Sequence, residues 1–151
     1  MALYMEWNDS LNTGIRTIDE QHKKIVSYIN KLHEVSAHPD QKVVRLVLEQ
    51  LVDYTDIHFK FEESLMADAQ YSHLVAHQKV HALFIRRILD YRSRFEAGED
   101  VTKLLLSTLR AWLISHIKSE DADYVSVVQV TMQQKEREEG WLARQLKRFF
   151  G

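Results

Sequence analysis

Two pairs of potential metal ligands stand four residues apart in this sequence. His58 and Glu62 form one pair within the stretch HFKFEE, and His77 and His81 form the other within HQKVH. Residues at this spacing lie on the same face of a helix. Imidazole together with carboxylate suits iron, manganese, zinc or copper. Each pair is therefore predicted to present two ligands to one place in the fold.

Two further histidines, His22 and His116, also fall on apolar helical stripes. A single histidine on such a stripe is more often a hydrogen-bonded core residue than a ligand. Five of them are different, because each unligated imidazole would be a buried polar group without partners, at a cost of about 1–3 kcal/mol. A shared metal site removes that cost, so the set favours metal binding over five unrelated core histidines.

The elements that position these residues are predicted to be four amphipathic helices. Apolar residues recur at helical spacing, and the chain has only four Gly and one Pro, which argues against a turn-rich β fold. Thr17 with Glu20 forms a capping-box pattern, and Ser72 and Asp100 are predicted N-caps for the third and fourth helices. The first two helices are predicted to span about residues 18–37 and 41–69. The third begins after Ser72 and ends at Gly98, and the fourth begins after Asp100 and continues past His116.

Short connections between these helices predict an all-α, antiparallel up-down-up-down four-helix bundle. In that topology the start of the first helix is level with the end of the second, the start of the third and the end of the fourth. Five imidazoles and one carboxylate then converge at one end of the bundle. Six or more ligands are too many for one zinc ion. They suit two six-coordinate ions bridged by carboxylates.

The composition excludes several classes of protein. At 151 residues the chain is most simply one domain, with 45% apolar and 28% charged residues. A formal charge of −2 gives no electrostatic argument for nucleic-acid binding, and the lack of cysteine excludes disulfides and iron–sulfur clusters. No apolar run is long enough to form an integral membrane segment, and the start MALYMEWNDS is unlike a secretory signal. We expect a cytoplasmic protein.

The two ends of the chain lie outside the predicted bundle of residues 17–127. Residues 1–16 read as an extended N-terminal arm that Trp7 and Ile15 could dock onto the bundle. Residues 132–151 are predicted to form a short C-terminal helix, interrupted at Gly140, with an apolar stripe opposite three basic residues. This helix is predicted to pack on its own bundle. The alternative is contact with another subunit, another protein or an anionic membrane surface; the oligomeric state is left open.

These motifs, in this order, resemble the hemerythrin family, specifically its single-domain bacterial members. The resemblance covers about residues 5–127 and rests on WNDSLNTGIRTIDEQH, HFKFEE, HQKVH and WLISHIKSEDADY. It implies two non-haem iron ions, bridged by an oxo or hydroxo group and by carboxylates, that bind dioxygen reversibly for oxygen transport, storage or local delivery. The implied metal ligands are His22, His58, Glu62, His77, His81, His116 and Asp121.

The resemblance also implies an apolar dioxygen pocket around the ligands, formed by Phe59, Trp112, Leu113 and Ile117. Reversible binding needs such a pocket, because water and outside acids must be kept away. The same residues could equally be ordinary core. We expect a binding protein and not an enzyme; the alternatives are a sensor of dioxygen, redox state or nitric oxide, and a peroxidase-like di-iron enzyme.

Asp121 poses a geometric problem. At about 100° per residue, the five residues from His116 turn about 500°, so Asp121 in a regular helix would point about 140° away from His116. We therefore predict a π-type turn between these two residues, which would bring Asp121 inward and place Tyr124 on the bundle side. Of the remaining histidines, His33 is predicted to be core, and His38 and His73 to be on the surface.

Overall fold

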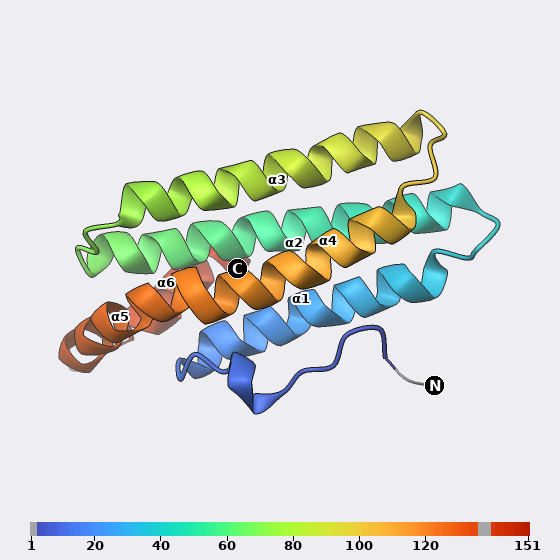
Figure 1. Cartoon of the computed structure of the whole chain (residues 1–151). Helices are drawn as coiled ribbons and strands as arrows, with labels where there is room; N and C mark the ends of the chain where they lie inside the picture. Colours follow the sequence, from blue (N-terminus) through green and yellow to red (C-terminus); the bar gives the residue numbers. More distant parts are fainter. Residues whose placement is uncertain (1–2, 136–139) are drawn as a thin grey trace.

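Four long helices pack side by side in an antiparallel bundle (Figure 1). The structure is a computed structural model and describes residues 3–135 and 140–151. No strand occurs among these residues, so the predicted all-α, up-down-up-down bundle is confirmed. The bundle helices are α1 (Arg16–Val35), α2 (Gln41–Asp68), α3 (Leu74–Glu96) and α4 (Thr102–His116).

The inward stripe of each helix supplies a common core. In α1 it contains Ile25, Ile29 and Leu32, each at most 3% exposed, and α2 contributes Leu48 and Leu51. Fully burying one such side chain contributes about 1.5–3 kcal/mol. The same apolar cluster includes Phe59, Leu113 and Ile117, so the core reaches the histidine-rich level.

The predicted helix starts need correction. Helix α1 begins at Arg16, and its N-cap residue Ile15 makes no side-chain cap, so the Thr17–Glu20 box is wrong. Instead, Asp19 accepts hydrogen bonds from the Thr13 backbone N–H (2.7 Å) and the Thr13 hydroxyl (2.8 Å), which ties the arm to the first turn of α1. The N-cap predictions for Ser72 and Asp100 are also wrong, because the N-cap residues of α3 and α4 are His73 and Val101.

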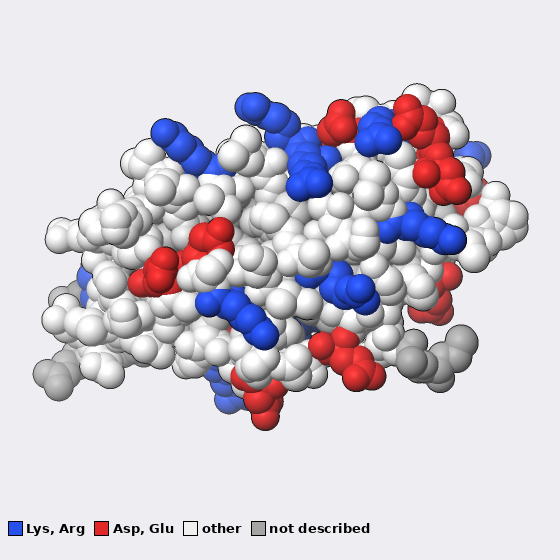
Figure 2. Space-filling model, in the orientation of Figure 1, with Lys and Arg blue, Asp and Glu red and all other residues white. Residues whose placement is uncertain are grey.

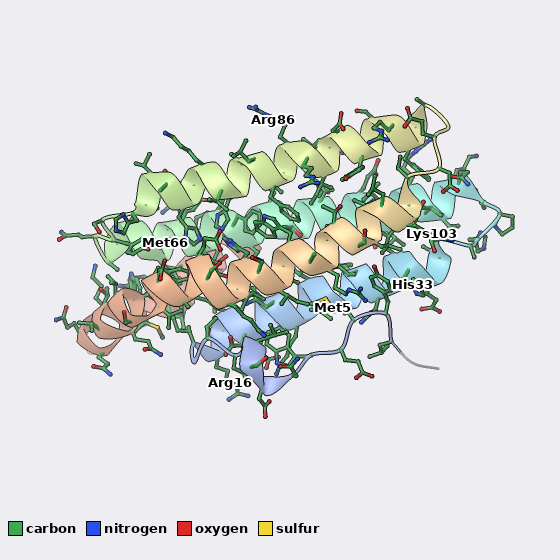
Figure 3. The ribbon with its side chains drawn as sticks, viewed as in Figure 1. Met5, Arg16, His33, Met66, Arg86 and Lys103 are labelled. Atoms are coloured by element: carbon green, nitrogen blue, oxygen red, sulfur yellow. The ribbon has the colours of Figure 1, made fainter. Side chains whose placement is uncertain are left out.

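The N-terminal arm runs along α1 and α4 (Figure 3). It contains one short 3₁₀ turn, η1 (Asp9–Leu11), and is otherwise extended. The Asn30 side chain binds the backbone of Met5 twice: its Oδ1 accepts from the Met5 N–H (2.8 Å), and its Nδ2 donates to the Met5 carbonyl oxygen (2.9 Å). His33 is exposed and stacks on Tyr4, with ring centroids 4.7 Å apart, so its assignment to the core is wrong. The neighbouring Leu32 takes the inward position, with 0% exposure.

Helix α4 continues through a widened turn into another helix. The turn η2 (Ile117–Asp121) has π-helical geometry, and α5 (Ala122–Lys135) follows it. Both Asp121 and Tyr124 are 0% exposed. The predicted π-type turn, and the inward placement of these two side chains, are therefore confirmed.

The last helix, α6 (Trp141–Phe150), packs back on α2 and α5. Residues 132–135 belong to α5, so the separate C-terminal helix begins later than predicted. The predicted interruption at Gly140 is confirmed, and its φ of 79° is a backbone conformation that glycine adopts easily. Asp68 accepts hydrogen bonds from Trp141 Nε1 (2.7 Å) and Gln145 Nε2 (2.9 Å), which fixes α6 to the end of α2. No helix in the described ranges is long and apolar enough to cross a membrane.

Candidate metal centre

Seven buried side chains from α1, α2, α3, α4 and η2 meet at one end of the bundle. They form two groups, and within each group one potential ligand atom per residue lies within 4.8 Å of the others. None of the seven side chains is more than 4% exposed. The first group is His77, His81, His116 and Asp121, and the second is His22, His58 and Glu62.

All five imidazoles turn their Nε2 atoms toward the centre of this cluster. His58 Nε2 lies 2.8 Å from Glu62 Oε1. Asp121 Oδ1 lies 3.1 Å from His116 Nε2 and 3.3 Å from His77 Nε2, while its Oδ2 lies 3.3 Å from His22 Nε2. Asp121 therefore reaches histidines of both groups, as a bridging carboxylate would.

In two of the imidazoles, the Nδ1 atom, which faces away from the centre, contacts an oxygen atom of a neighbouring side chain. His58 Nδ1 lies 2.6 Å from Gln21 Oε1, and His81 Nδ1 lies 2.8 Å from Glu63 Oε2. A carboxylate or amide oxygen can only accept, so each Nδ1 carries a proton, and Nε2 is the nitrogen that could bind a metal. Such outer hydrogen bonds orient imidazoles that bind metals. The sequence analysis missed both residues, although Gln21 directly precedes His22 and Glu63 directly follows Glu62.

Several polar atoms that face the centre make no hydrogen bond of good geometry, although they lie close to one another. They are His58 Nε2, His77 Nε2, Glu62 Oε1 and both carboxylate oxygens of Asp121. Buried polar groups in native proteins are normally paired, and each unpaired one costs about 1–3 kcal/mol. Nitrogen lone pairs and carboxylate oxygens are metal ligands, so cations at this point would satisfy all of them together. The residues present fit a metal centre.

The electrostatics of the cluster also favour cations. Burial and the charge of Asp121 act to raise the pKa of Glu62, but His58 outweighs them and lowers it to about 2. Burial likewise acts to raise the pKa of Asp121, yet contacts with His116, His22 and His77 hold it well below its ordinary value. Both carboxyl groups are therefore anionic at neutral pH, within a buried space where a positive charge is needed to compensate them.

Tyr124 is a further polar residue of the centre. Its phenol is fully buried and donates a hydrogen bond to Glu62 Oε2. Burial first, and then the charge of Glu62, raise the pKa of Tyr124 well above its ordinary value, so the phenol keeps its proton. The sequence argument placed Tyr124 on the bundle side but missed this contact, since helical periodicity gives a direction and no partner.

Aromatic rings cover the imidazoles on the core side. Phe59 stacks on His81 with ring centroids 3.8 Å apart, and Trp112 stacks on His116 at 4.3 Å. Leu113 and Ile117 are each 3% exposed and belong to the same core cluster as Phe59. The four residues predicted to form an apolar pocket are thus all on the core side of the histidines.

Both histidines that were predicted to be on the surface lie outside the ligand cluster. His38 and His73 are both exposed, as expected. His38 Nδ1 accepts a hydrogen bond from the Asp40 backbone N–H in the loop before α2. His73 precedes α3, where its ring meets that of Tyr71 edge-on with centroids 5.7 Å apart.

Known proteins match this chain over most of its length. The family model described as the hemerythrin HHE cation binding domain matches residues 13–128. A bacteriohemerythrin of Pseudomonas aeruginosa (strain LESB58) is 50% identical over 98% of this chain and 99% of its own length. A bacteriohemerythrin of Stenotrophomonas maltophilia (strain R551-3) is 45% identical over the whole of both chains.

A solved structure gives the same result. The crystal structure of a wild-type hemerythrin has a TM-score of 0.78 and 31% identity, covering 83% of this chain and 98% of that one. The family binds a non-haem pair of iron ions, and the two facing groups of histidine and carboxylate ligands suit that centre. The sequence, the fold and the buried ligand cluster together show that this chain belongs to the hemerythrin family and is similar to single-domain bacteriohemerythrins.

Proposed function

We propose that this protein binds dioxygen reversibly, as an oxygen carrier, store or local donor, at two iron ions held by the seven clustered side chains. When bound, the iron pair supplies the electrons for dioxygen binding. One observation carries the proposal: the histidines divide unevenly, three with Asp121 and two with Glu62. If the carboxylates are shared, the two-histidine side has one ligand fewer and leaves room for an outside molecule.

The protein's own residues would hold and orient these ligands. Gln21 and Glu63 fix the Nδ1 atoms of His58 and His81, and Tyr124 holds one oxygen of Glu62. Each of these contacts aims the remaining lone pairs at the centre. A site in which the ligands are already aligned needs little rearrangement between its states, which favours reversible binding.

The apolar wall supports binding over turnover. Phe59 and Trp112 lie flat against His81 and His116, and Leu113 and Ile117 are packed beside them. Apolar residues at this place exclude water and slow the proton transfer that would release reduced oxygen. A peroxidase-like enzyme needs the opposite, a supply of protons to the site. A sensor role is the other alternative, and it predicts a ligand-dependent change in a partner contact.

The visible absorption spectrum tests the proposal. Fully reduced, iron-loaded protein should be nearly colourless, should gain a charge-transfer band on aeration, and should lose it under vacuum over repeated cycles. Zinc-loaded protein is the control and should stay colourless. If the iron-loaded protein oxidises on first contact with air and the spectral change cannot be reversed under vacuum, the proposed role as an oxygen carrier is wrong. Catalytic consumption of a reductant with hydrogen peroxide would favour the enzyme.

A further inference from the structure

Three surface cavities reach residues of the metal centre. A cavity of about 660 Å³ between α1 and α6 reaches Gln21. A second of about 330 Å³ between α2 and α3 reaches Phe59 and His81. The third, of about 310 Å³, lies between the start of α3 and the η2–α5 junction and reaches His77. Each is a potential route between solvent and the buried ligands.

The charges lining these cavities differ. The α1–α6 cavity contains Arg16, Lys23 and Lys24 against one carboxylate, Glu20. In the α2–α3 cavity, Lys60 and Arg86 balance two carboxylates, and Figure 3 shows Arg86 projecting from α3. The first lining repels a free divalent cation, and the second, being balanced, does not attract one.

The third cavity is acidic. Its charged lining residues are Glu120 and Asp123, joined by the exposed imidazole of His73, and none of its described lining residues is Lys or Arg. Figure 2 shows acidic side chains on this face, between the start of α3 and the passage of α4 into α5. A cleft lined by charges of one sign concentrates counter-ions and raises their rate of association.

The inner wall of this cavity is a residue of the metal centre itself. His77 lines the cavity but is only 4% exposed, and its Nε2 has no hydrogen-bond partner and lies 3.3 Å from Asp121 Oδ1. The π-type turn η2 also connects the cavity with the metal centre, because its consecutive residues Glu120 and Asp121 face the two places. Glu120 is half-exposed at the cavity and 3.7 Å from His116 Nδ1, while the next residue, Asp121, points into the centre.

We propose that this cavity is where divalent iron is captured before it reaches the buried centre, with His73, Glu120 and Asp123 as transient ligands and His77 as the first permanent one. Imidazole and carboxylate are suitable ligands for iron(II), and no change of oxidation state is involved. The proposal rests on the function proposed above, because it assumes that the cluster holds iron. It concerns the rate of loading and leaves the final iron content unchanged.

Anaerobic loading of the metal-free protein tests this assignment. Iron(II) is mixed with the protein, and uptake is followed by quenching samples into a chromophoric iron chelator. Asp123→Lys should slow uptake about 3- to 10-fold while reaching the same final content, because one negative and one positive charge then line the cavity in place of two negative ones. His73→Ala should slow it to a smaller extent. Added salt should slow uptake by the native chain and have less effect on Asp123→Lys.

Matched charge reversals in the other cavities serve as controls. Glu20→Lys lies in the α1–α6 cavity and Asp56→Lys in the α2–α3 cavity, and both should load at the native rate. Equal uptake rates for Asp123→Lys and the native chain would overturn the proposal, as would slower uptake in Asp56→Lys than in Asp123→Lys. A native chain that never acquires two irons would instead contradict the proposed function, so the two failures are distinguishable.

Discussion

The Asp121 carboxylate lies 3.1 Å from His116 Nε2, although the two residues are five positions apart in the chain. In a regular helix they would point about 140° apart, at about 100° per residue. The π-type turn η2 removes this angle, and Asp121 becomes the residue that contacts histidines from both ligand groups. Such turns are rare and tend to occur at functional sites.

Replacing this carboxylate should remove iron. Asp121→Asn keeps the size of the side chain but loses the charge and one acceptor, so we expect fewer than two irons per chain after equilibrium loading. The matched control is Asp123→Asn, an exposed carboxylate in the same stretch, which should keep two irons. Metal analysis checks both. Two irons and unchanged dioxygen binding in Asp121→Asn would show that Asp121 is not a bridge.

The native chain should contain two irons, and the histidines should differ in their importance. His77→Ala removes an Nε2 that faces the centre, and should cost most of the iron held with His81 and His116. His33→Ala should leave the iron content unchanged, because His33 is exposed and stacks on Tyr4. One metal ion per native chain, measured after growth with adequate iron, would contradict a di-iron centre.

Tyr124→Phe should destabilise the protein without unfolding it. The substitution leaves one oxygen of the fully buried Glu62 without its donor, at a cost of about 1–3 kcal/mol. Urea unfolding of the iron-loaded protein measures this cost. Tyr71→Phe is the control, since its ring lies 6.4 Å from that of Tyr124 but is only partly buried. An equal loss in both variants would mean that the contact with Glu62 contributes nothing specific.

Leu113→Ala should speed autoxidation. It opens space in the core cluster beside Phe59, admits water toward the histidines and costs about 2–5 kcal/mol of stability. Leu104→Ala is matched in chemistry and lies in the same helix, but Leu104 is 49% exposed and should change neither property. The decay of the aerated spectrum measures the rate. If Leu113→Ala keeps its iron and decays at the native rate, Leu113 does not shield the site.

The metal-free protein should lose stability toward both acid and alkali. The lowered pKa of Glu62, about 2 against an ordinary 4.5, gives stability that is present above pH 4.5 and is lost as pH falls through the folded-state value. Burial acts to lower the pKa of His22 and His116, but Asp121 outweighs it and raises both above 6.5. Their contribution is present below pH 6.5 and is lost as pH rises through the raised values.

Urea midpoints of the metal-free chain at about pH 3, 5.5 and 8.5 measure both effects, and the middle value should be the highest. Asp121→Asn should flatten the alkaline side, because the carboxylate that raises the two histidine pKa values is gone. A midpoint in the native chain that climbs steadily from acid to alkali would contradict the assignment.

The arrangement of the helices and the direction of most ligand side chains were predictable from helical periodicity. The bundle, the inward direction of His22, His58 and His81, and even the widened turn before Asp121 follow from spacing together with the family resemblance. Helix starts were less predictable, because Asp19 competes with the Thr17–Glu20 pattern by bonding to the arm. Contacts such as Tyr124 with Glu62 depend on how two helices meet, which periodicity within either helix does not specify.

The extra residue accommodated by η2 also shifts the phase of everything that follows it. In Figure 1, α4 and α5 form one rod, and beyond the turn Tyr124 and Val128 are 0% exposed, in the cluster that also contains Trp141 of α6. If η2 took regular α-helical geometry with all of its residues kept, the rest of the rod would rotate by about 100°. That straightening would turn Asp121 away from the histidines and Val128 away from its cluster. The inward position of Asp121 and the apolar platform for the C-terminal helix therefore depend on the same widened turn.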